Sequence, residues 1–270
     1  MPTYCLRFFS MLLCLFFTAC STTPQLAGYP LHEKTAVGQS SRVRHIVLHY
    51  TSLDTTASLE TLTQAQVSSH YLISDEQPPK LYRLVPESER AWHAGLSQWY
   101  QHTDLNTSSI GIEIVNAGHQ ADGSWAAYQP AQITLLQALL HDVATRHRVK
   151  PSHIVGHSDI APQRKIDPGP LFPWQQLAAD GLGRWYDSAQ AQHYQAEIEL
   201  YGLPSNAAIQ QLLHKAGYAV PLDGKWDKSS QNVMAAFQMH YRPARYDGTP
   251  DAESIAILKA LQDPLPHLWH

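Results

Sequence analysis

Four short segments in the first half of the chain have the pattern of β-strands. Residues 42–51 (RVRHIVLHYT) carry apolar side chains on both faces, which is typical of a strand in the centre of a sheet. Residues 68–74 and 80–85 are two more strand-like runs, joined by the turn EQPP. Residues 109–115 (SIGIEIV) alternate, with isoleucines on one face and an acid on the other. A carboxylate inside an apolar strand is costly to bury, so Glu113 needs a partner or a chemical role.

One helix with a clear apolar period follows these strands. Residues 130–149 begin with a proline, which suits the first turn of a helix. The apolar stripe at helical spacing consists of Ile133, Leu136, Leu140 and Val143. The helix leads into the short strand HIVGH. Strands interleaved with a helix predict an α/β domain over residues 41–186, with a mixed central sheet flanked by helices.

The pattern changes towards the C-terminus. Residues 187–203 are polar and compatible with a helix but lack a strong apolar stripe, and we interpret them as a linker. Residues 204–265 contain three short helix-like runs separated by turns rich in Gly and Asp. The expected architecture is therefore an α/β domain followed by a small all-α domain of three helices.

The N-terminus has the pattern of an export signal. Arg7 precedes an apolar run, residues 8–19, which is shorter than the ~20 residues needed to span a bilayer. The run ends in FTAC, which resembles the lipobox of bacterial lipoproteins. Residues 1–19 are then a lipoprotein signal peptide, Cys20 is the lipidated first residue of the mature chain, and residues 20–40 are a tether. An ordinary cleaved signal peptide is the alternative.

The residues around the lipobox extend this prediction. Ser21 follows the lipidated position, and by the same resemblance a residue other than Asp there implies sorting to the outer membrane, facing the periplasm. All three cysteines, Cys5, Cys14 and Cys20, lie in this leader, so no disulfide is expected in the mature chain.

The charge of the chain argues against a nucleic-acid partner. It carries 19 basic and 23 acidic side chains, a formal net charge of −4, which leaves no basic footprint for phosphates. We expect a monomer.

A kinked loop, GHSDIAPQRKIDPG, concentrates the candidate chemistry. Its prolines and glycines exclude a continuous helix or a central strand. His157 and Asp167 could meet at a metal if the loop turns, and His49, at the end of a central strand, is the best third ligand. Taken alone, the spacing is also compatible with a strand-end histidine bonded to backbone and with an Asx-turn before Pro168.

Five sequence blocks together resemble the type-2 N-acetylmuramoyl-L-alanine amidase family. They are IVLHYT, SSHYLI, AWHAG, SIGIEI and the kinked loop, in family order over residues 40–175. The resemblance implies a zinc-dependent hydrolase that cuts the amide between the lactyl group of N-acetylmuramic acid and L-alanine in peptidoglycan or muropeptides. It implies one Zn²⁺, held by His49, His157 and Asp167.

The resemblance also implies roles for residues around the metal. Zinc-bound water would attack the amide, with Glu113 as general base and then acid. Lys165 would help to stabilise the oxyanion. The expected substrate-binding residues are Trp92, His93 and Arg164. For these three, a packed Trp with a hydrogen-bonded His, and an Arg in solvent, remain alternatives.

Several further residues near these blocks also receive an interpretation. Gly111 would leave room for substrate beside Glu113. His45 and His70 are interpreted as structural histidines, with His45 satisfied inside the core. Gln163 stands where many relatives have Gly, at a loop tip away from the ligands.

The C-terminal residues resemble a peptidoglycan-binding type-1 module. Trp226, Tyr201 and Tyr218 are then candidate sugar-stacking side chains. A helical cap that packs on the catalytic domain and binds nothing is the alternative. A different class, a peptidoglycan-recognition protein without activity, is disfavoured because all three ligand positions and the acid are filled.

Overall fold

The computed structural model describes residues 25–263 of the chain. The expected signal peptide and Cys20 therefore lie outside the described residues. Residues up to Ser40 form a unit of their own, in which β1 (Gln25–Leu26) pairs antiparallel with β2 (Tyr29–Pro30). Between residues 25 and 263, no helix is long and apolar enough to cross a bilayer.

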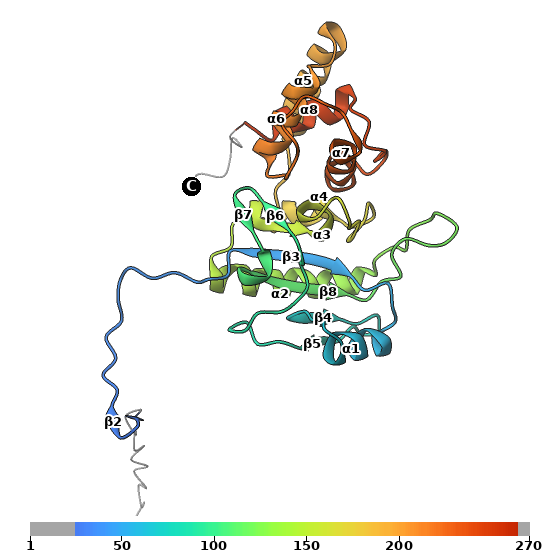
Figure 1. The fold of residues 1–270 in the computed structure, drawn as a ribbon. Helices are drawn as coiled ribbons and strands as arrows, with labels where there is room; N and C mark the ends of the chain where they lie inside the picture. The colour runs from blue at the N-terminus through green and yellow to red at the C-terminus, as the bar shows by residue number, and fades with distance from the viewer. Residues whose placement is uncertain (1–24, 264–270) are drawn as a thin grey trace, which may run out of the picture. The chain divides into compact units, whose positions relative to one another are not determined.

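The second unit, which begins at Ser41, contains a five-stranded sheet with the order β5-β4-β8-β3-β9 (Figure 1). Its strands are β3 (His45–Tyr50), β4 (Tyr71–Ile73), β5 (Leu81–Arg83), β8 (Ser109–Ile114) and β9 (Ile154–Gly156). β4, β8, β3 and β9 run parallel, and β5 is antiparallel to β4, so the expected mixed sheet is confirmed. Parallel neighbours bring their carboxyl ends to one edge of the sheet, where sites form in open α/β folds.

One face of the sheet packs against α2 (Pro130–His147). Ile46 and Leu48 of β3 are fully buried on this face. The helix buries all four members of its predicted stripe, and Arg148 ends it in the left-handed conformation. This apolar layer explains why one set of alternating positions in the two central strands is aliphatic.

The opposite face carries the polar side chains. Because side chains alternate along a strand, His45 and His49 point to the side that faces away from α2. β8 is in register with β3, so that Glu113 lies directly beside His49 and Gly111 beside Val47. Short elements cover this face: α1 (Thr55–Gln64), β6 (Gln98–Trp99), β7 (His102–Thr103), η1 (Leu105–Thr107), η2 (Pro151–His153) and α3 (His157–Ile160). α4 (Trp174–Ala179) instead buries Trp174 and Leu177 in the cluster that includes α2.

The C-terminal part is helical, as expected, but has one helix more than the sequence predicts. Its helices are α5 (Ser188–Tyr201), α6 (Asn206–Ala216), α7 (Lys228–Tyr241) and α8 (Ala252–Ala260). Each begins at an Asp or Ser whose side chain accepts a backbone N–H of the first turn: Asp187, Ser205, Asp227 and Asp251.

The linker prediction for residues 187–203 is wrong for most of that segment. Residues 188–201 form α5, which packs on α8 and buries Ala191 and Ile198 in the C-terminal core. Only these two residues of the helix are buried, seven positions apart. So narrow an apolar contact leaves almost no periodic signal, and the packing partner decides the structure.

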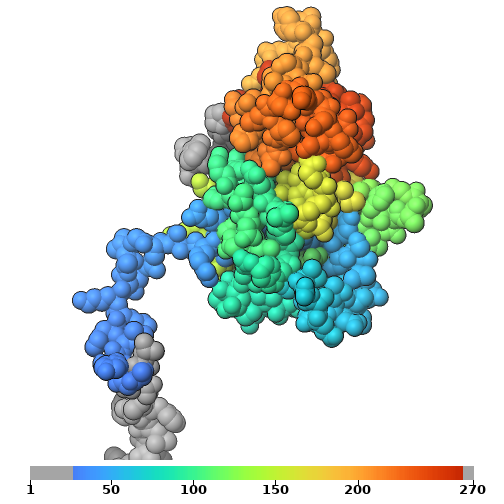
Figure 2. Space-filling view, viewed as in Figure 1, coloured from blue at the N-terminus to red at the C-terminus, as the bar shows by residue number. Residues whose placement is uncertain are grey.

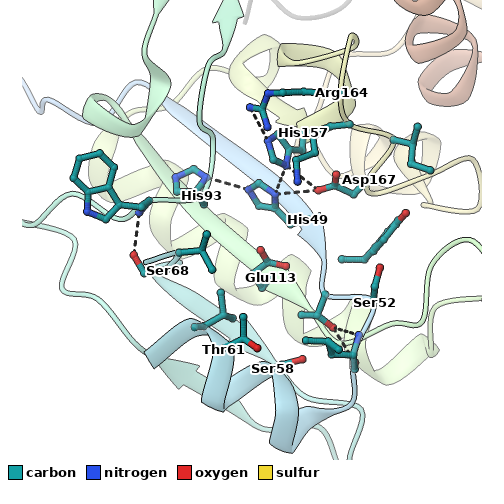
Figure 3. A pocket seen from close by; sticks show the side chains of 18 residues that line it. His49, Ser52, Ser58, Thr61, Ser68, His93, Glu113, His157, Arg164 and Asp167 are labelled. Atoms are coloured by element: carbon teal, nitrogen blue, oxygen red, sulfur yellow. Dashed lines mark hydrogen bonds and ion pairs between the residues drawn. The ribbon is translucent and has the colours of Figure 1, made fainter. Parts of the chain in front are cut away.

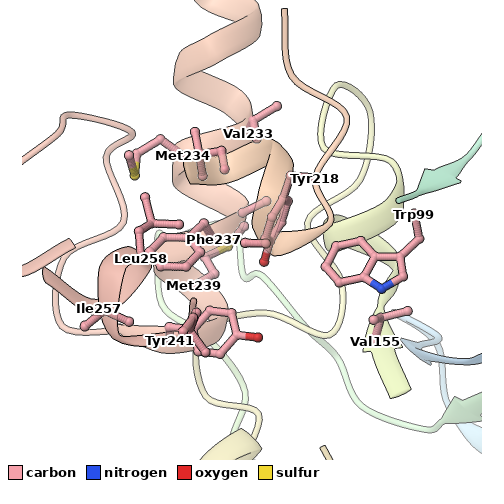
Figure 4. Close-up of a cluster of buried hydrophobic side chains, with 14 of the residues drawn as sticks. Trp99, Val155, Tyr218, Val233, Met234, Phe237, Met239, Tyr241, Ile257 and Leu258 are labelled. Atoms are coloured by element: carbon pink, nitrogen blue, oxygen red, sulfur yellow. The ribbon is translucent and has the colours of Figure 1, made fainter. Parts of the chain in front are cut away.

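The helical part and the α/β part share one hydrophobic core. Val155 of β9 and Trp99 of β6 lie in the same buried cluster as Tyr218 and Phe237 of the helical part (Figure 4). Figure 2 shows the orange and red C-terminal helices lying against the yellow segment that includes α3 and α4. Tyr218 is 1% exposed, so its expected role as a sugar-stacking side chain is wrong. Tyr201, at 82% exposed, stays a candidate.

A cluster of three histidines lies on the same face of the sheet as His49, at the start of β3. His45 is fully buried, stacks on His153 at 4.7 Å between ring centroids, and meets His102 edge-on at 5.1 Å. Neither ring nitrogen of His45 has a hydrogen-bond partner among the described residues, so it is a core histidine but not the satisfied one expected. Burial, together with the neighbouring histidines, lowers the pKa of His45 from 6.5 to about 3.

This depressed pKa predicts a loss of stability in mild acid. Below about pH 6.5 the unfolded chain protonates at His45, whereas the folded chain stays neutral there until about pH 3. The contribution is therefore complete above pH 6.5 and falls as the pH drops towards 3. We expect His45→Leu, which leaves no partner unpaired, to lose less Tm between pH 7.5 and 5.5 than the unsubstituted protein, measured calorimetrically without metal. An equal fall in Tm for the two proteins would contradict the lowered pKa of His45.

Candidate metal centre

Three donor atoms converge where the carboxyl ends of β3 and β9 meet. His49 lies near the end of β3, His157 is the first residue of α3 directly after β9, and Asp167 lies in the following loop. The Nδ1 atoms of His49 and His157 are 3.0 Å apart, and Asp167 Oδ2 lies 3.0 and 3.1 Å from them (Figure 3). All three residues are buried. The structure therefore brings together the three ligands predicted from the sequence.

The hydrogen bond behind His157 determines which of its ring nitrogens carries the proton. His157 Nε2 lies 3.1 Å from the carbonyl oxygen of Ala94. A carbonyl only accepts, so Nε2 carries the hydrogen and Nδ1 keeps its lone pair. His157 therefore points a free donor atom at Asp167.

A chain of three hydrogen bonds determines which ring nitrogen of His49 carries the proton. The Ser109 hydroxyl donates to the carbonyl of Leu105 at 2.6 Å, so its oxygen accepts from His93 Nε2 at 3.1 Å. His93 Nδ1 then accepts from His49 Nε2 at 3.0 Å, which leaves His49 Nδ1 as a lone pair. We call Ser109, His93 and His49 the tautomer chain.

The resulting donor set fits a metal cation. Two imidazole lone pairs and a carboxylate oxygen face one another with no proton between them, which is repulsive unless a cation lies there. A tetrahedral Zn²⁺ site, with bonds of about 2.0–2.2 Å, holds its donors roughly 3.4 Å apart, close to the spacing seen.

The pKa values of His49 and Asp167 agree with this protonation state. Burial, reinforced by His157, lowers the pKa of His49 to about 4, so the ring is neutral at pH 7. Burial alone would raise the pKa of Asp167, but the contacts with His157 and His49 hold it well below its ordinary value. Neutral imidazoles and an ionised carboxylate are the forms that bind a metal.

The donor set opens into a cavity of about 370 Å³. Besides the ligands, the cavity is lined by Thr51, Ser52, Ser58, Thr61 and Leu62, from α1 and the turn before it, among other residues. α1 was not predicted from the sequence, although Asp54 is an N-cap followed by leucines at positions 59 and 62. One side of the centre is thus accessible to a ligand.

Glu113 lies at the floor of this cavity, below His49 (Figure 3). Its Oε2 is buried and has no hydrogen-bond partner among the described residues. Burial, followed by the nearby Asp167, raises the pKa of Glu113 well above its ordinary value, and Lys165 opposes this in part. An unpartnered carboxyl with a raised pKa is the arrangement expected of a group that exchanges protons.

His93 lines the cavity and is hydrogen-bonded, as the alternative interpretation of this residue expected, whereas Gly111 does not leave the expected space. Both ring nitrogens of His93 are occupied within the tautomer chain, which favours positioning of His49 over substrate contact. A Cβ on Gly111 would lie 2.5 Å from the His93 ring. The space beside Glu113 that was expected to admit substrate is therefore filled by His93.

The other predicted residues line the cavity to different degrees. Arg164 lines it, but its guanidinium donates to the backbone carbonyls of Ala94 and Leu96. Trp92 is half exposed, and the Arg90 guanidinium lies 3.9 Å from its ring centroid. Within residues 25–263, Lys165 lines the cavity without an ion-pair partner.

Sequence comparison decides the family. The N-acetylmuramoyl-L-alanine amidase family model matches residues 39–170, and a peptidoglycan binding domain model matches residues 204–258. The chain is 45% identical to the N-acetylmuramoyl-L-alanine amidase AmiD of Escherichia coli over 243 residues, which cover 87% of this chain and 88% of that protein. The chain belongs to the N-acetylmuramoyl-L-alanine amidase family. The predicted amidase identity and fold class are thereby confirmed.

Similarity to solved structures extends the match to most of the chain. AmpDh3 from Pseudomonas aeruginosa superimposes with a TM-score of 0.81 at 41% identity, covering 85% of this chain and 95% of that one. AmiD of E. coli, in complex with anhydro-N-acetylmuramic acid-L-Ala-D-γ-Glu-L-Lys, gives 0.79 at 44% identity, covering 88% and 95%. Both proteins therefore share the fold of the α/β part and of the helical part.

Removal of the Ser109 hydroxyl tests the tautomer chain. In Ser109→Ala, His93 Nε2 loses its acceptor. The other His93 tautomer, with the proton on Nδ1 and donating towards His49, can then compete with the tautomer that accepts from His49. We expect metal affinity to fall by roughly 10- to 100-fold, as for other groups that orient metal-bound histidines, measured by competition with a chromogenic chelator.

A buried serine that does not belong to the tautomer chain is the matched control. Ser69 is fully buried and its hydroxyl has no hydrogen-bond partner among the described residues, so Ser69→Ala should leave metal affinity within about twofold. Equal effects of the two substitutions would show that the chain does not control the tautomer of His49.

Proposed function

We propose that this amidase hydrolyses the bond between the lactyl group of N-acetylmuramic acid and L-alanine, in muropeptides that include the 1,6-anhydro form, with one Zn²⁺ bound by His49, His157 and Asp167. The observation that carries the proposal is the convergence of three proton-free donors beside an unpartnered carboxyl in one cavity. The anhydromuramic ligands in the AmiD and AmpDh3 complexes support the substrate class.

The residues fit zinc in type as well as spacing. Two imidazoles and one carboxylate, with one position left open, are a common catalytic zinc set. When bound, such an ion supplies a Lewis acid that polarises the amide carbonyl and acidifies water. The protein contributes the donors, their tautomers and a largely buried site around them.

Glu113 carries the proton in this proposal. Its unpartnered Oε2 faces the cavity, where it takes a proton from the attacking water and then returns it to the departing alanine nitrogen. The base must be ionised to begin, and its raised pKa moves that requirement to higher pH. Turnover should therefore fall as the pH drops below this raised pKa.

Basic and aromatic side chains at the cavity would stabilise the negative charge on the carbonyl oxygen and contact the substrate. Lys165, which has no ion-pair partner in the described part of the chain, places a cation where the carbonyl oxygen becomes negative. Arg164 and Trp92 at the rim are positioned to contact the stem peptide or the sugar. His93 acts through His49 and not on the substrate.

Glu113→Gln separates chemistry from metal binding. The amide keeps the shape of the side chain but cannot accept the proton, so we expect kcat to fall by about 10²–10⁴-fold while zinc content stays near one per chain. Mass spectrometry of products from defined anhydro and reducing-end muropeptides would measure the bond cut and the rate, and atomic emission the metal.

Two controls accompany this experiment. Glu60→Gln on the exposed side of α1 should retain the unsubstituted rate. Thorough chelation should abolish turnover, and added Zn²⁺ should restore it. A Glu113→Gln protein with a near-normal rate, or products cut at another bond, would contradict the proposal.

We infer from the sequence that the chain is anchored to the outer membrane through Cys20, facing the periplasm. The support is the lipobox-like FTAC and the apolar run before it. Acyl chains on one cysteine add about 0.8 kcal/mol of membrane affinity per buried CH₂, so several chains hold a protein stably.

Cys20→Ala tests the anchor in a Gram-negative host. The unsubstituted chain should incorporate labelled palmitate and sediment with outer membranes, whereas Cys20→Ala should do neither. Cys14→Ala, a change in the apolar run before the lipobox, is the matched control and should behave as the unsubstituted chain. A soluble, unlabelled parent chain would favour the ordinary signal peptide.

A further inference from the structure

The eleven residues from His157 to Asp167 supply two of the three metal donors and consist of short turns. α3 is four residues long, and the segment after it contains a proline and turns. The Ala161 N–H donates to the His157 carbonyl, and the Ala161 carbonyl accepts from the N–H groups of Arg164 and Lys165. The Ser158 N–H closes the segment by donating to the Asp167 carbonyl, at 2.8 Å. We call residues 157–167 the ligand loop. Holding such a loop in one conformation costs backbone entropy, so contacts from outside must help to compensate.

A buried carboxylate in this loop reaches into the helical part. Asp159 is 1% exposed. Its Oδ1 accepts from the Tyr218 hydroxyl at 2.7 Å, and its Oδ2 accepts from the Gly156 N–H at 2.8 Å and lies 2.8 Å from His240 Nδ1. One side chain therefore joins the end of β9 to the residue after the α6 C-cap and to α7.

His240 contacts the chain on the far side of the loop as well. Its ring stacks between Trp174 of α4, at 4.0 Å and 9°, and Tyr241, at 4.1 Å and 16°. Asp159 precedes Asp167 in the chain and Trp174 follows it. A single residue of α7 thus touches both flanks of the segment that carries Asp167.

The exposed tip of the loop is tied to the same helix. Gln163 Nε2 donates to the carbonyl and to the hydroxyl of Ser229, both at 3.0 Å. Gln163 Oε1 accepts from Asn232 Nδ2 at 3.0 Å. Gln163 was expected at a loop tip away from the ligands, and the structure shows its side chain bonded to the first turns of α7.

We propose that the helical C-terminal part is a structural component of the metal centre, because Tyr218 and His240, through Asp159, hold the ligand loop in the conformation that brings His157 and Asp167 together. Tyr218, His240 and Gln163 are positioning residues that touch no ligand atom. This inference rests on the proposed metal site. It assigns the helical part a role that does not depend on its binding peptidoglycan.

Tyr218→Phe removes only the hydroxyl that Asp159 accepts and keeps the ring in the core. We expect the rate of Zn²⁺ release from the folded, zinc-loaded protein into excess chromogenic chelator to rise about tenfold, the lower end for groups that support metal ligands. Gln163→Ala, an exposed change that does not threaten folding, should accelerate release by a smaller factor, about two- to threefold.

Tyr241→Phe is the matched control. Tyr241 lies in the same core and stacks on the same histidine, and its hydroxyl makes no hydrogen bond within the described residues. It should release Zn²⁺ at the unsubstituted rate, with release measured well below Tm so that global unfolding does not contribute.

The outcomes separate the two proposals. Release from Tyr218→Phe at the unsubstituted rate, or equal acceleration in Tyr218→Phe and Tyr241→Phe, would overturn the positioning role while leaving the amidase site intact. An unsubstituted protein that binds no stoichiometric Zn²⁺ but still cleaves muropeptides would overturn the metal site, and the positioning role with it.

Discussion

Three proton acceptors about 3 Å apart in a buried corner of a sheet are the constraint on which this structure depends. Such a cluster repels itself unless a cation lies within it, and it can exist only if no ring nitrogen turns a proton inward. The carbonyl of Ala94 and the tautomer chain from Ser109 satisfy that condition from behind. The polar groups around the donors therefore matter as much as the donors.

The same face of the sheet explains the placement of Glu113, the candidate proton-transfer group. β8 is in register with β3, so a carboxyl on β8 lies beside a histidine on β3 without any loop to position it. Glu113 Oε2 is buried without a hydrogen-bond partner among the described residues, and burial raises the pKa of Glu113. A rigid strand thus supplies the acid, whereas a loop supplies two of the ligands, and only the loop needs support from the helices that follow.

Much of this arrangement was predictable from local pattern and from family blocks. The central strands, the long helix and its stripe follow from apolar periodicity, which reports burial directly. His49, His157 and Asp167 were each identifiable from the blocks that surround them. The helix at 188–201 was not, because its few buried residues make contact with a helix 60 residues away in the chain. His93 was identified as a site residue, but its partners, and so its role, were not visible.

The sequence by itself determined the class of protein, the order in which the candidate site residues occur along the chain, and which side chains are candidate metal ligands, because those depend on residue type and short-range spacing. Only the tertiary structure decided what those side chains are bonded to. Ser109 meets His93, and Asp159 meets Tyr218 and His240, across separations from 16 to 81 residues. Hydrogen bonds of that range leave no periodic trace in a single sequence, since they arise from the packing of elements and not from the preferences of their residues.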